Sequence, residues 1–350
     1  MEYLSFKHKA NPVSITYLMM MALCVCLAAC SPTFMGNNAV CQSNCTIGSG
    51  VQGVRVFVEP DAGDQIITDA IIHATTSVWL EIYLLTDQKI IRALETVAHR
   101  GIDVRVMLEP DPYGGGSPTK TIDLLSAAGM KIQNTNPSFA LTHEKGMVID
   151  SSTAYIMTAN FTLSALGGSS SVTNREYGII DANQQDVQAV MNIFYADWNH
   201  TDVQLNAPNL VISPINSRQA FTSLINRAHN SLLIEAEEMQ DSLLEQALIN
   251  AAKRGVRVQV ILPTASSSSA DSNSAGIDTI KRGDVYVRED TRLYMHAKII
   301  VVDGQVAFVG SENISTASLE NNRELGIIIS DSDVLSILQQ TFQQDWNDSL

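Results

Sequence analysis

The sequence has few basic residues, few cysteines and a single apolar run near its N-terminus. Lys and Arg total 22 against 37 Asp and Glu, which gives a formal net charge of −15. An acidic surface repels polyanions at long range, so this balance disfavours general nucleic-acid binding without excluding a local basic groove. The composition is not that of a membrane channel. The length of 350 residues fits two compact units that each bury a core.

The apolar run extends from Val13 to Ala29. It is too short and too poorly flanked for a transmembrane span, so it predicts a secretory signal. The run ends in Leu27-Ala28-Ala29-Cys30, which resembles the bacterial lipobox, where cleavage before the cysteine leaves a diacylglycerol on its sulfur. We therefore expect a signal peptide over residues 1–29 and a lipidated Cys30. A plain signal peptide and a retained single-pass anchor are the alternatives.

The residues after Cys30 predict where the protein is held. Ser31 stands where, by the same resemblance, an Asp would favour the inner membrane of a two-membrane bacterium. We expect residues 30–50 to form an anchor and linker. The exported protein would then be held on the outer membrane by its N-terminal lipid, facing the periplasm or the exterior.

Cysteine usage agrees with export. Two of the five cysteines lie in the expected signal peptide and Cys30 would be lipidated, so only Cys41 and Cys45 remain. A lone pair in an oxidising compartment predicts a small disulfide loop between them. The alternative, half of a metal site, needs further ligands nearby, and none follows; we expect no metal here.

An internal repeat is the most informative feature of the sequence. Residues 98–106 match 252–260, and each segment predicts a helix that ends at a glycine followed by an alternating strand. Upstream, Ser77–Glu81 parallels Ser231–Glu235, and both predict strands. The two copies predict two domains, which cover residues 51–203 and 204–350.

Helical and strand patterns alternate within each copy, which is typical of an α/β layered domain. The expected fold class is α/β, with two tandem domains that are each a mixed β-sheet flanked by helices. In the first copy the patterns predict helices at 62–75, 87–100, 119–129 and 183–198, and strands at 53–58, 78–84, 103–109, 146–150, 154–158 and 176–181.

The same polar residues recur at the same place in both copies. The first copy has His143-Glu144-Lys145 and the second has His296-Ala297-Lys298, each leading into an apolar strand that ends at an aspartate. An asparagine and a glutamate follow in both. The recurring residues are His143, Lys145, Asp150, Asn160 and Glu176, and His296, Lys298, Asp303, Asn313 and Glu324.

These residue types suit phosphoryl transfer. On a strand, His and Lys two positions apart point to the same face and can reach one ligand. An imidazole can act as nucleophile or as acid and base near neutral pH. Lysine supplies positive charge for an anionic phosphate, and the Asn amide adds a hydrogen-bond donor. A carboxylate on a later strand could hold the imidazole tautomer.

The pattern His-x-Lys-x4-Asp followed by Gly-Ser-x-Asn resembles the phospholipase D superfamily, and the second copy matches all of it. The resemblance implies two domains that face each other across a pseudo-twofold axis, with both His-x-Lys pairs in one cleft and no cofactor. It also implies that one histidine forms a phosphohistidine and the other protonates the leaving alcohol. By family precedent, His143 is the nucleophile and His296 the acid and base. The first copy departs from the pattern at Met157-Thr158, where the family has Gly-Ser.

We expect from this resemblance an enzyme that hydrolyses or exchanges the headgroup of phospholipids. The alternatives are a non-specific endonuclease and a cardiolipin synthase-type phosphatidyltransferase. The expected partners are a phospholipid or other phosphodiester and the membrane, with nucleic acid disfavoured by the acidic charge. No obligate protein partner is inferred.

Other residues have structural explanations. Asp150 and Asp303 lie at strand ends before turns, so we expect them to fix local backbone or inter-domain structure and to take no part in chemistry. Trp198 and Trp346 are expected to be core aromatics. Glu144 is expected to face solvent or to be paired.

Overall fold

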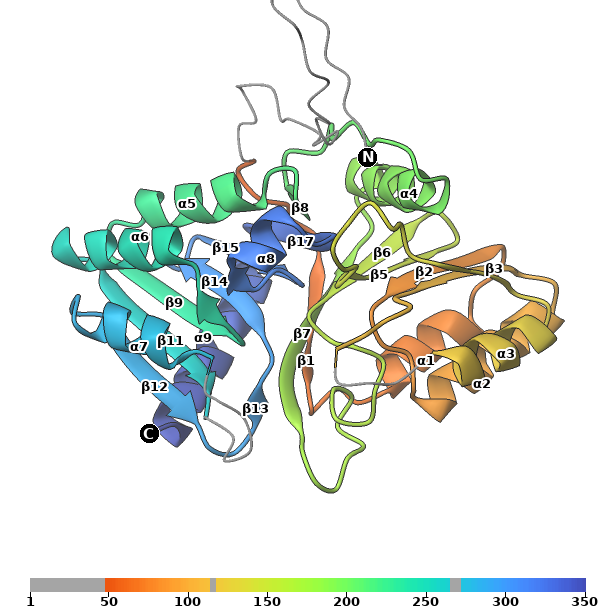
Figure 1. Cartoon of the computed structure of the whole chain (residues 1–350), viewed down its shortest axis with the longest axis horizontal. Helices are drawn as coiled ribbons and strands as arrows, with labels where there is room; N and C mark the ends of the chain where they lie inside the picture. Colours follow the sequence, from red (N-terminus) through yellow and green to blue (C-terminus); the bar gives the residue numbers. More distant parts are fainter. Residues whose placement is uncertain (1–47, 114–117, 265–271) are drawn as a thin grey trace, which may run out of the picture. The chain divides into compact units, whose positions relative to one another are not determined.

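A computed structural model describes residues 48–113, 118–264 and 272–350 of the chain (Figure 1). The expected signal peptide, the lipidated Cys30 and the Cys41–Cys45 disulfide lie outside the described residues and stay predictions.

The first copy forms a mixed β-sheet in which strands far apart in sequence are neighbours. Its strands follow the order β1-β7-β6-β5-β2-β3-β4 across the sheet. Helices α1, α2 and α3 lie together beside this sheet (Figure 1). The bounds are β1 (Arg55–Glu59), α1 (Gln65–Ile72), β2 (Ser77–Ile82), α2 (Gln88–His99), β3 (Asp103–Leu108), α3 (Thr119–Ala127), β4 (Lys131–Asn134), β5 (Lys145–Ile149), β6 (Thr153–Met157), β7 (Asn174–Asp181) and α4 (Gln184–Trp198).

The second copy repeats this sheet strand for strand, in the order β8-β17-β15-β14-β9-β11-β12. Short strands β10 and β16 pair with each other, and β13 pairs with β7 of the first sheet. The bounds are β8 (Leu210–Ser213), α5 (Ser217–Arg227), β9 (Ser231–Ala236), β10 (Met239–Gln240), α6 (Ser242–Lys253), β11 (Arg257–Pro263), α7 (Ser274–Lys281), β12 (Tyr286–Asp290), β13 (Tyr294–Met295), β14 (Lys298–Val302), β15 (Val306–Gly310), β16 (Ile314–Ser315), α8 (Thr316–Glu320), β17 (Glu324–Ile329) and α9 (Ser332–Asp348).

Equivalent local signals build equivalent elements in the two copies. Asp87 and Asp241 are the N-cap residues of α2 and α6, and each side chain accepts a hydrogen bond from a backbone N–H of the first turn. Gly101 and Gly255 follow the same two helices with φ of 85° and 90°, a conformation that favours glycine. The prediction of two tandem α/β repeats, each a mixed sheet flanked by helices, is confirmed.

The central strands are buried on both faces, which explains their unbroken apolar sequences. In β14, Ile300 and Val302 pack in a cluster with helices α5 and α6 of their own copy. Ile299 and Val301 point the other way and join a cluster that includes Val148 of the first sheet. Because side chains alternate along a strand, one face of each sheet packs on α1–α3 or α5–α7 of its own copy. The other face joins a cluster that both copies share and that also includes residues of α4 and α9.

No helix within the described ranges is long and apolar enough to cross a membrane.

Candidate active site

The first His-x-Lys pair lies where strand β5 begins. Lys145 is the first residue of β5 and pairs with Ile82 at the end of β2. Its side chain is 1% exposed, and its ammonium donates to the carbonyl of His143 and lies 5.2 Å from the centroid of the Tyr83 ring. The Tyr83 ring also meets the His143 ring edge to face, with centroids 4.8 Å apart.

The second pair has the same backbone setting and different neighbours. Lys298 begins β14 and pairs with Ala236 at the end of β9. Its ammonium donates to the His296 carbonyl at 2.6 Å and to Glu237 Oε2 at 2.8 Å.

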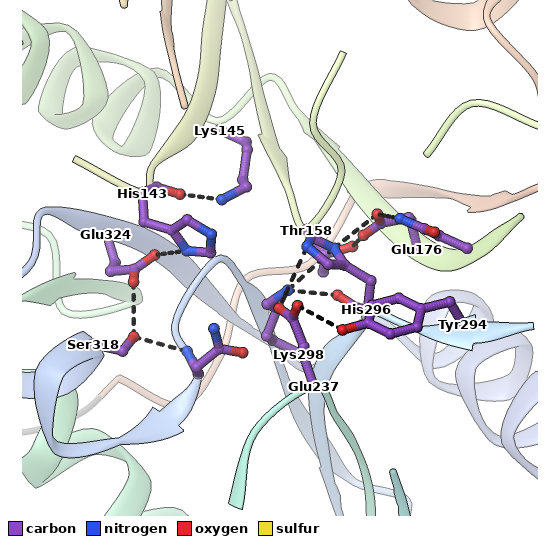
Figure 2. A network of polar contacts seen from close by, with 12 residues as sticks. His143, Lys145, Thr158, Glu176, Glu237, Tyr294, His296, Lys298, Ser318 and Glu324 are labelled. Atoms are coloured by element: carbon purple, nitrogen blue, oxygen red, sulfur yellow. Dashed lines mark hydrogen bonds and ion pairs between the residues drawn. The ribbon is translucent and has the colours of Figure 1, made fainter. Parts of the chain in front are cut away.

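Each histidine is held by a glutamate of the other copy. His143 Nδ1 lies 3.1 Å from Glu324 Oε2, and His296 Nδ1 lies 2.8 Å from Glu176 Oε1 (Figure 2). Both carboxylates are fully buried. A carboxylate on Nδ1 fixes the imidazole tautomer and leaves Nε2 for chemistry.

Backbone pairing between the copies produces this exchange. Thr142 forms a parallel bridge with Arg323, which places the next residues, His143 and Glu324, side by side. In the same way Met295 of β13 pairs with Arg175 of β7, which places His296 beside Glu176. The surroundings of each motif histidine therefore depend on the packing of both copies.

Hydroxyl and amide groups complete the surroundings of the two glutamates. Thr158 Oγ1 donates to Glu176 at 2.6 Å, and Ser318 Oγ donates to Glu324 at 2.8 Å. Asn174 also donates to Glu176, at 2.9 Å. Burial raises the pKa of both carboxyls, but the histidine that each one contacts reverses this effect and holds the pKa of each below its ordinary value. Both glutamates are therefore ionised at neutral pH.

Thr158 keeps the hydrogen bonding of the serine that the family pattern has at its position. Its Oγ1 accepts the backbone N–H of Tyr177 at 2.9 Å, and Ser311 Oγ in the second copy accepts the backbone N–H of Leu325 at 3.1 Å. Threonine in place of serine therefore preserves the hydrogen bond between the side-chain hydroxyl at position 158 and strand β7, which carries Glu176.

Burial favours neutral groups in the first pair. It lowers the pKa of His143, and the nearby Lys145 lowers it further. Burial also lowers the pKa of Lys145, to about 7. A neutral His143 has a lone pair to attack with, and a bound phosphate would favour the charged form of Lys145.

The two motif asparagines are buried, and each has an Oδ1 atom with no hydrogen-bond partner among the described residues. The backbone N–H of Asn313 is held by Ser318 Oγ at 2.8 Å. Because Ser318 also contacts Glu324, the asparagine of the second copy and the carboxylate that serves His143 share one support.

The motif aspartates serve the backbone and not the histidines. Asp150 accepts hydrogen bonds from the backbone N–H groups of Thr75, Thr76 and Ser77, where β2 begins. Asp303 does the same for the three residues His229 to Ser231, where β9 begins. These bonds hold the pKa of both aspartates below the ordinary value, although burial opposes them.

Glu144 is expected to face solvent or to be paired, and the first of these two expectations is wrong. Its side chain is buried, with 2% exposure, beside two other buried carboxylates. One oxygen each from Glu81, Glu144 and Asp197 lie within 4.8 Å of one another. This spacing could hold a cation, but Arg323 already forms an ion pair with Asp197 at 2.8 Å. Burial, and next the charge of Asp197, raise the pKa of Glu144 to about 8, so a proton neutralises it at neutral pH.

We expect Glu144→Gln to remove a pH dependence of stability. The pKa of Glu144 is higher in the folded chain than its ordinary value, so the folded state binds more protons than the unfolded state between about pH 5 and pH 8. The free energy of unfolding therefore falls as pH rises through this window. Gln carries no titrating proton, and the decline should shrink by roughly 2–5 kcal/mol.

Denaturant unfolding at pH 5, 7 and 9 measures this effect. Asp202→Asn, which removes a charge from an exposed residue, is the matched control and should leave the profile unchanged. Parallel profiles for the wild type and Glu144→Gln would contradict the prediction.

Sequence reasoning missed three residues of this network: Tyr83, Glu237 and Tyr294. Glu237 Oε2 lies 3.4 Å from His296 Nε2, and Tyr294 donates to Glu237 Oε1 at 3.3 Å (Figure 2). A signal was present, because the match of Ser77–Glu81 with Ser231–Glu235 continues two residues further and aligns Tyr83 with Glu237.

Comparisons with known proteins agree with the fold and the paired motifs. A family model described as "Cardiolipin synthase, PLD-like domain" matches residues 67–198 and again 221–346. The chain therefore belongs to the phospholipase D superfamily, with two phospholipase D-like repeats.

Individual relatives are distant. The chain is 25% identical to a cardiolipin synthase of Clostridium perfringens over 74% of its own length and 62% of that protein, so it spans less than two thirds of this relative. It is 30% identical to a phospholipase D of Rickettsia felis over 38% of its length and 64% of that protein. The solved phosphatidylserine synthase of Haemophilus influenzae is 14% identical, with a TM-score of 0.64 over 85% of this chain and 87% of that one, and supports the fold alone.

Proposed function

We propose that this chain is a phosphatidyltransferase of the cardiolipin synthase type, which moves a phosphatidyl group from one alcohol to another through a phosphohistidine. The observation that supports the proposal best is the reciprocal network, in which each histidine has a buried carboxylate of the other copy on Nδ1. Because both histidines have a carboxylate on Nδ1, one can act as the nucleophile and the other as the acid and base.

In the first step, His143 Nε2 attacks phosphorus and a P–N bond forms while the P–O bond to the headgroup breaks. The proton on His296 Nε2 goes to the departing alcohol oxygen. Lys145 and Lys298 neutralise the non-bridging oxygens as charge shifts onto them. Glu324 stabilises the positive charge that develops on the imidazole of His143.

In the second step, His296 Nε2 takes the proton of an incoming alcohol, and its oxygen attacks phosphorus. The P–N bond breaks, which restores neutral His143 and protonated His296. One phosphodiester has exchanged its headgroup alcohol for the incoming alcohol, with no net change in charge. Water in place of the alcohol would give hydrolysis by the same sequence.

The relatives favour the alternative of a cardiolipin synthase-type phosphatidyltransferase over the main expectation of a phospholipase D that hydrolyses or exchanges headgroups. The match to a protein named cardiolipin synthase covers 74% of the chain, whereas the match to one named phospholipase D covers 38%. The net charge of −15 disfavours the nuclease alternative, since a polyanion would be repelled.

The test uses the full chain in detergent micelles that contain labelled phosphatidylglycerol, with plasmid DNA in parallel. We expect a diphosphatidyl product and free glycerol, and turnover should persist in EDTA because lysines supply the positive charge. The control is the double variant His143→Ala/His296→Ala. Phosphatidic acid as the sole lipid product would replace transfer by hydrolysis, and DNA cleavage without lipid turnover would support a nuclease.

We also propose that Cys30 carries a lipid that holds the protein on the outer membrane, near its substrate. The support is the Leu27-Ala28-Ala29-Cys30 sequence. Cys30→Ser should move the protein out of the membrane fraction or leave its signal peptide uncut, as membrane fractionation and intact mass would record. Normal processing with unchanged membrane retention would overturn this proposal.

A further inference from the structure

The polar network has a first half around His143 and Lys145 and a second half around His296 and Lys298. The two halves differ at one position beside the histidine Nε2 atoms. Tyr83 and Glu237 each follow the strand that pairs with a catalytic lysine, β2 in the first copy and β9 in the second. Because the copies share their strand order and pairing, these residues occupy equivalent places, and one is a neutral ring where the other is a carboxylate.

Glu237 contacts three groups of the second half. Its Oε2 lies 2.8 Å from Lys298 Nζ and 3.4 Å from His296 Nε2, and its Oε1 accepts from the hydroxyl of Tyr294. Its side chain is 19% exposed, unlike the fully buried Glu176 and Glu324. The Glu237 carboxylate therefore lies beside His296 Nε2, the proposed donor and acceptor of the alcohol proton. The exposed part of this carboxylate is accessible to a ligand.

Among the described residues, no carboxylate lies in the equivalent place in the first half. Tyr83 presents its ring to His143 and Lys145, and its hydroxyl oxygen accepts the backbone N–H of Tyr113. His143 Nε2 has no carboxylate contact like the one at His296 Nε2 among the ion pairs of the described residues.

We propose that Glu237 forms the alcohol subsite of the second half and binds a hydrogen-bond donor on the substrate alcohol, either a second hydroxyl or an ammonium group. This inference rests on the phosphatidyl transfer proposed above. Glu237 is a specificity-determining residue, and its carboxylate makes the halves unequal.

Charge places the two parts of the substrate. Lys298 is already paired with Glu237, whereas Lys145 has no carboxylate partner among the ion pairs of the described residues. The anionic oxygens of a phosphodiester are therefore attracted most by Lys145, so the phosphoryl group lies toward the first half. The alcohol oxygen must lie at His296 Nε2, within a few ångströms of Glu237. The attacking hydroxyl gives its own hydrogen to His296. A carboxylate, which only accepts, is therefore satisfied by a second donor on the same alcohol.

A monohydric alcohol lacks this donor, so Glu237 keeps only Lys298 and Tyr294 as partners and the exposed part of its carboxylate receives no hydrogen bond from the substrate. Hydrogen bonds to charged groups are among the stronger ones, and a binding site rejects analogues that leave its polar groups unpaired. The wild type should therefore prefer glycerol or ethanolamine to 1-propanol by more than their relative reactivity.

The experiment is a competition in one tube, with one phosphatidyl donor and equal amounts of glycerol, ethanolamine and 1-propanol. The variants are Glu237→Gln, which removes the charge at nearly constant shape, and Glu237→Tyr, which installs the residue of the first half. Glu238→Gln, at the next residue, is the control. Product ratios are measured by mass spectrometry, and they do not depend on how much of each preparation is folded.

We expect the ratio of glycerol or ethanolamine product to 1-propanol product to fall about 10-fold or more in both Glu237 variants and to stay constant in Glu238→Gln. A drop for ethanolamine alone identifies ammonium as the donor, and a drop for glycerol identifies a hydroxyl. Unchanged ratios with lower turnover on every alcohol would overturn the subsite and leave Glu237 as a support for Lys298. A wild type that forms no product with any alcohol would remove the proposed transfer itself, and the subsite with it.

Discussion

His143→Ala is expected to abolish the phosphohistidine intermediate and to lower phosphodiester turnover by about 10,000-fold or more, since it removes the proposed nucleophile. His296→Asn is expected to behave differently. With an activated phosphodiester, the leaving group needs little protonation, so attack by His143 can still occur. No base then remains to activate the acceptor, and the adduct should accumulate.

Quenching each variant during reaction, followed by peptide mapping, locates the adduct. Replacement of His99 by Ala, at the exposed end of α2, is the matched control and should react as the wild type does. An adduct on His296, with His143 unmodified, would reverse the two roles and leave the two-histidine mechanism in place.

The second large effect concerns Glu176 and Glu324, each of which contacts the histidine of the other copy. Glu324→Gln should lower the rate of adduct formation, because Glu324 orients His143, whereas Glu176→Gln should slow adduct breakdown through His296. Each loss is expected to be about 100- to 10,000-fold, because a neutral amide cannot stabilise an imidazolium and can favour the wrong tautomer.

Single-turnover kinetics with an activated substrate separate the two steps. The burst of leaving group should be slow in Glu324→Gln and fast in Glu176→Gln, with the adduct persisting only in the latter. If Glu176→Gln slows the burst while the adduct forms on His143, each histidine depends on the glutamate of its own copy, which would contradict the structure.

Local sequence determined much of the fold. The helices predicted at 87–100 and 183–198 are α2 (Gln88–His99) and α4 (Gln184–Trp198), because each has a capping side chain at its start and apolar residues at helical spacing. Strand β4 (Lys131–Asn134) was not predicted. It is short and lies at the edge of its sheet, so no buried face imposes an apolar pattern on it.

The repeat also predicted which residues matter, since His143 and His296 recur with the same companions. It could not predict which glutamate serves which histidine. Sequence order suggests partners within one copy, whereas the parallel pairing of Thr142 with Arg323, and of β13 with β7, brings the partners together across copies. That pairing forms only when the two sheets pack.

The sequence by itself determined two α/β repeats, the motif residues in each and the family to which they belong. Only the tertiary structure decided the exchange of glutamates, the burial of Glu144 and the place of Glu237 beside His296 Nε2. The physical reason is that alternation along a strand specifies two faces but not what covers them. For Glu144 the covering groups are the carboxylates of Glu81 and Asp197, which come from distant parts of the chain.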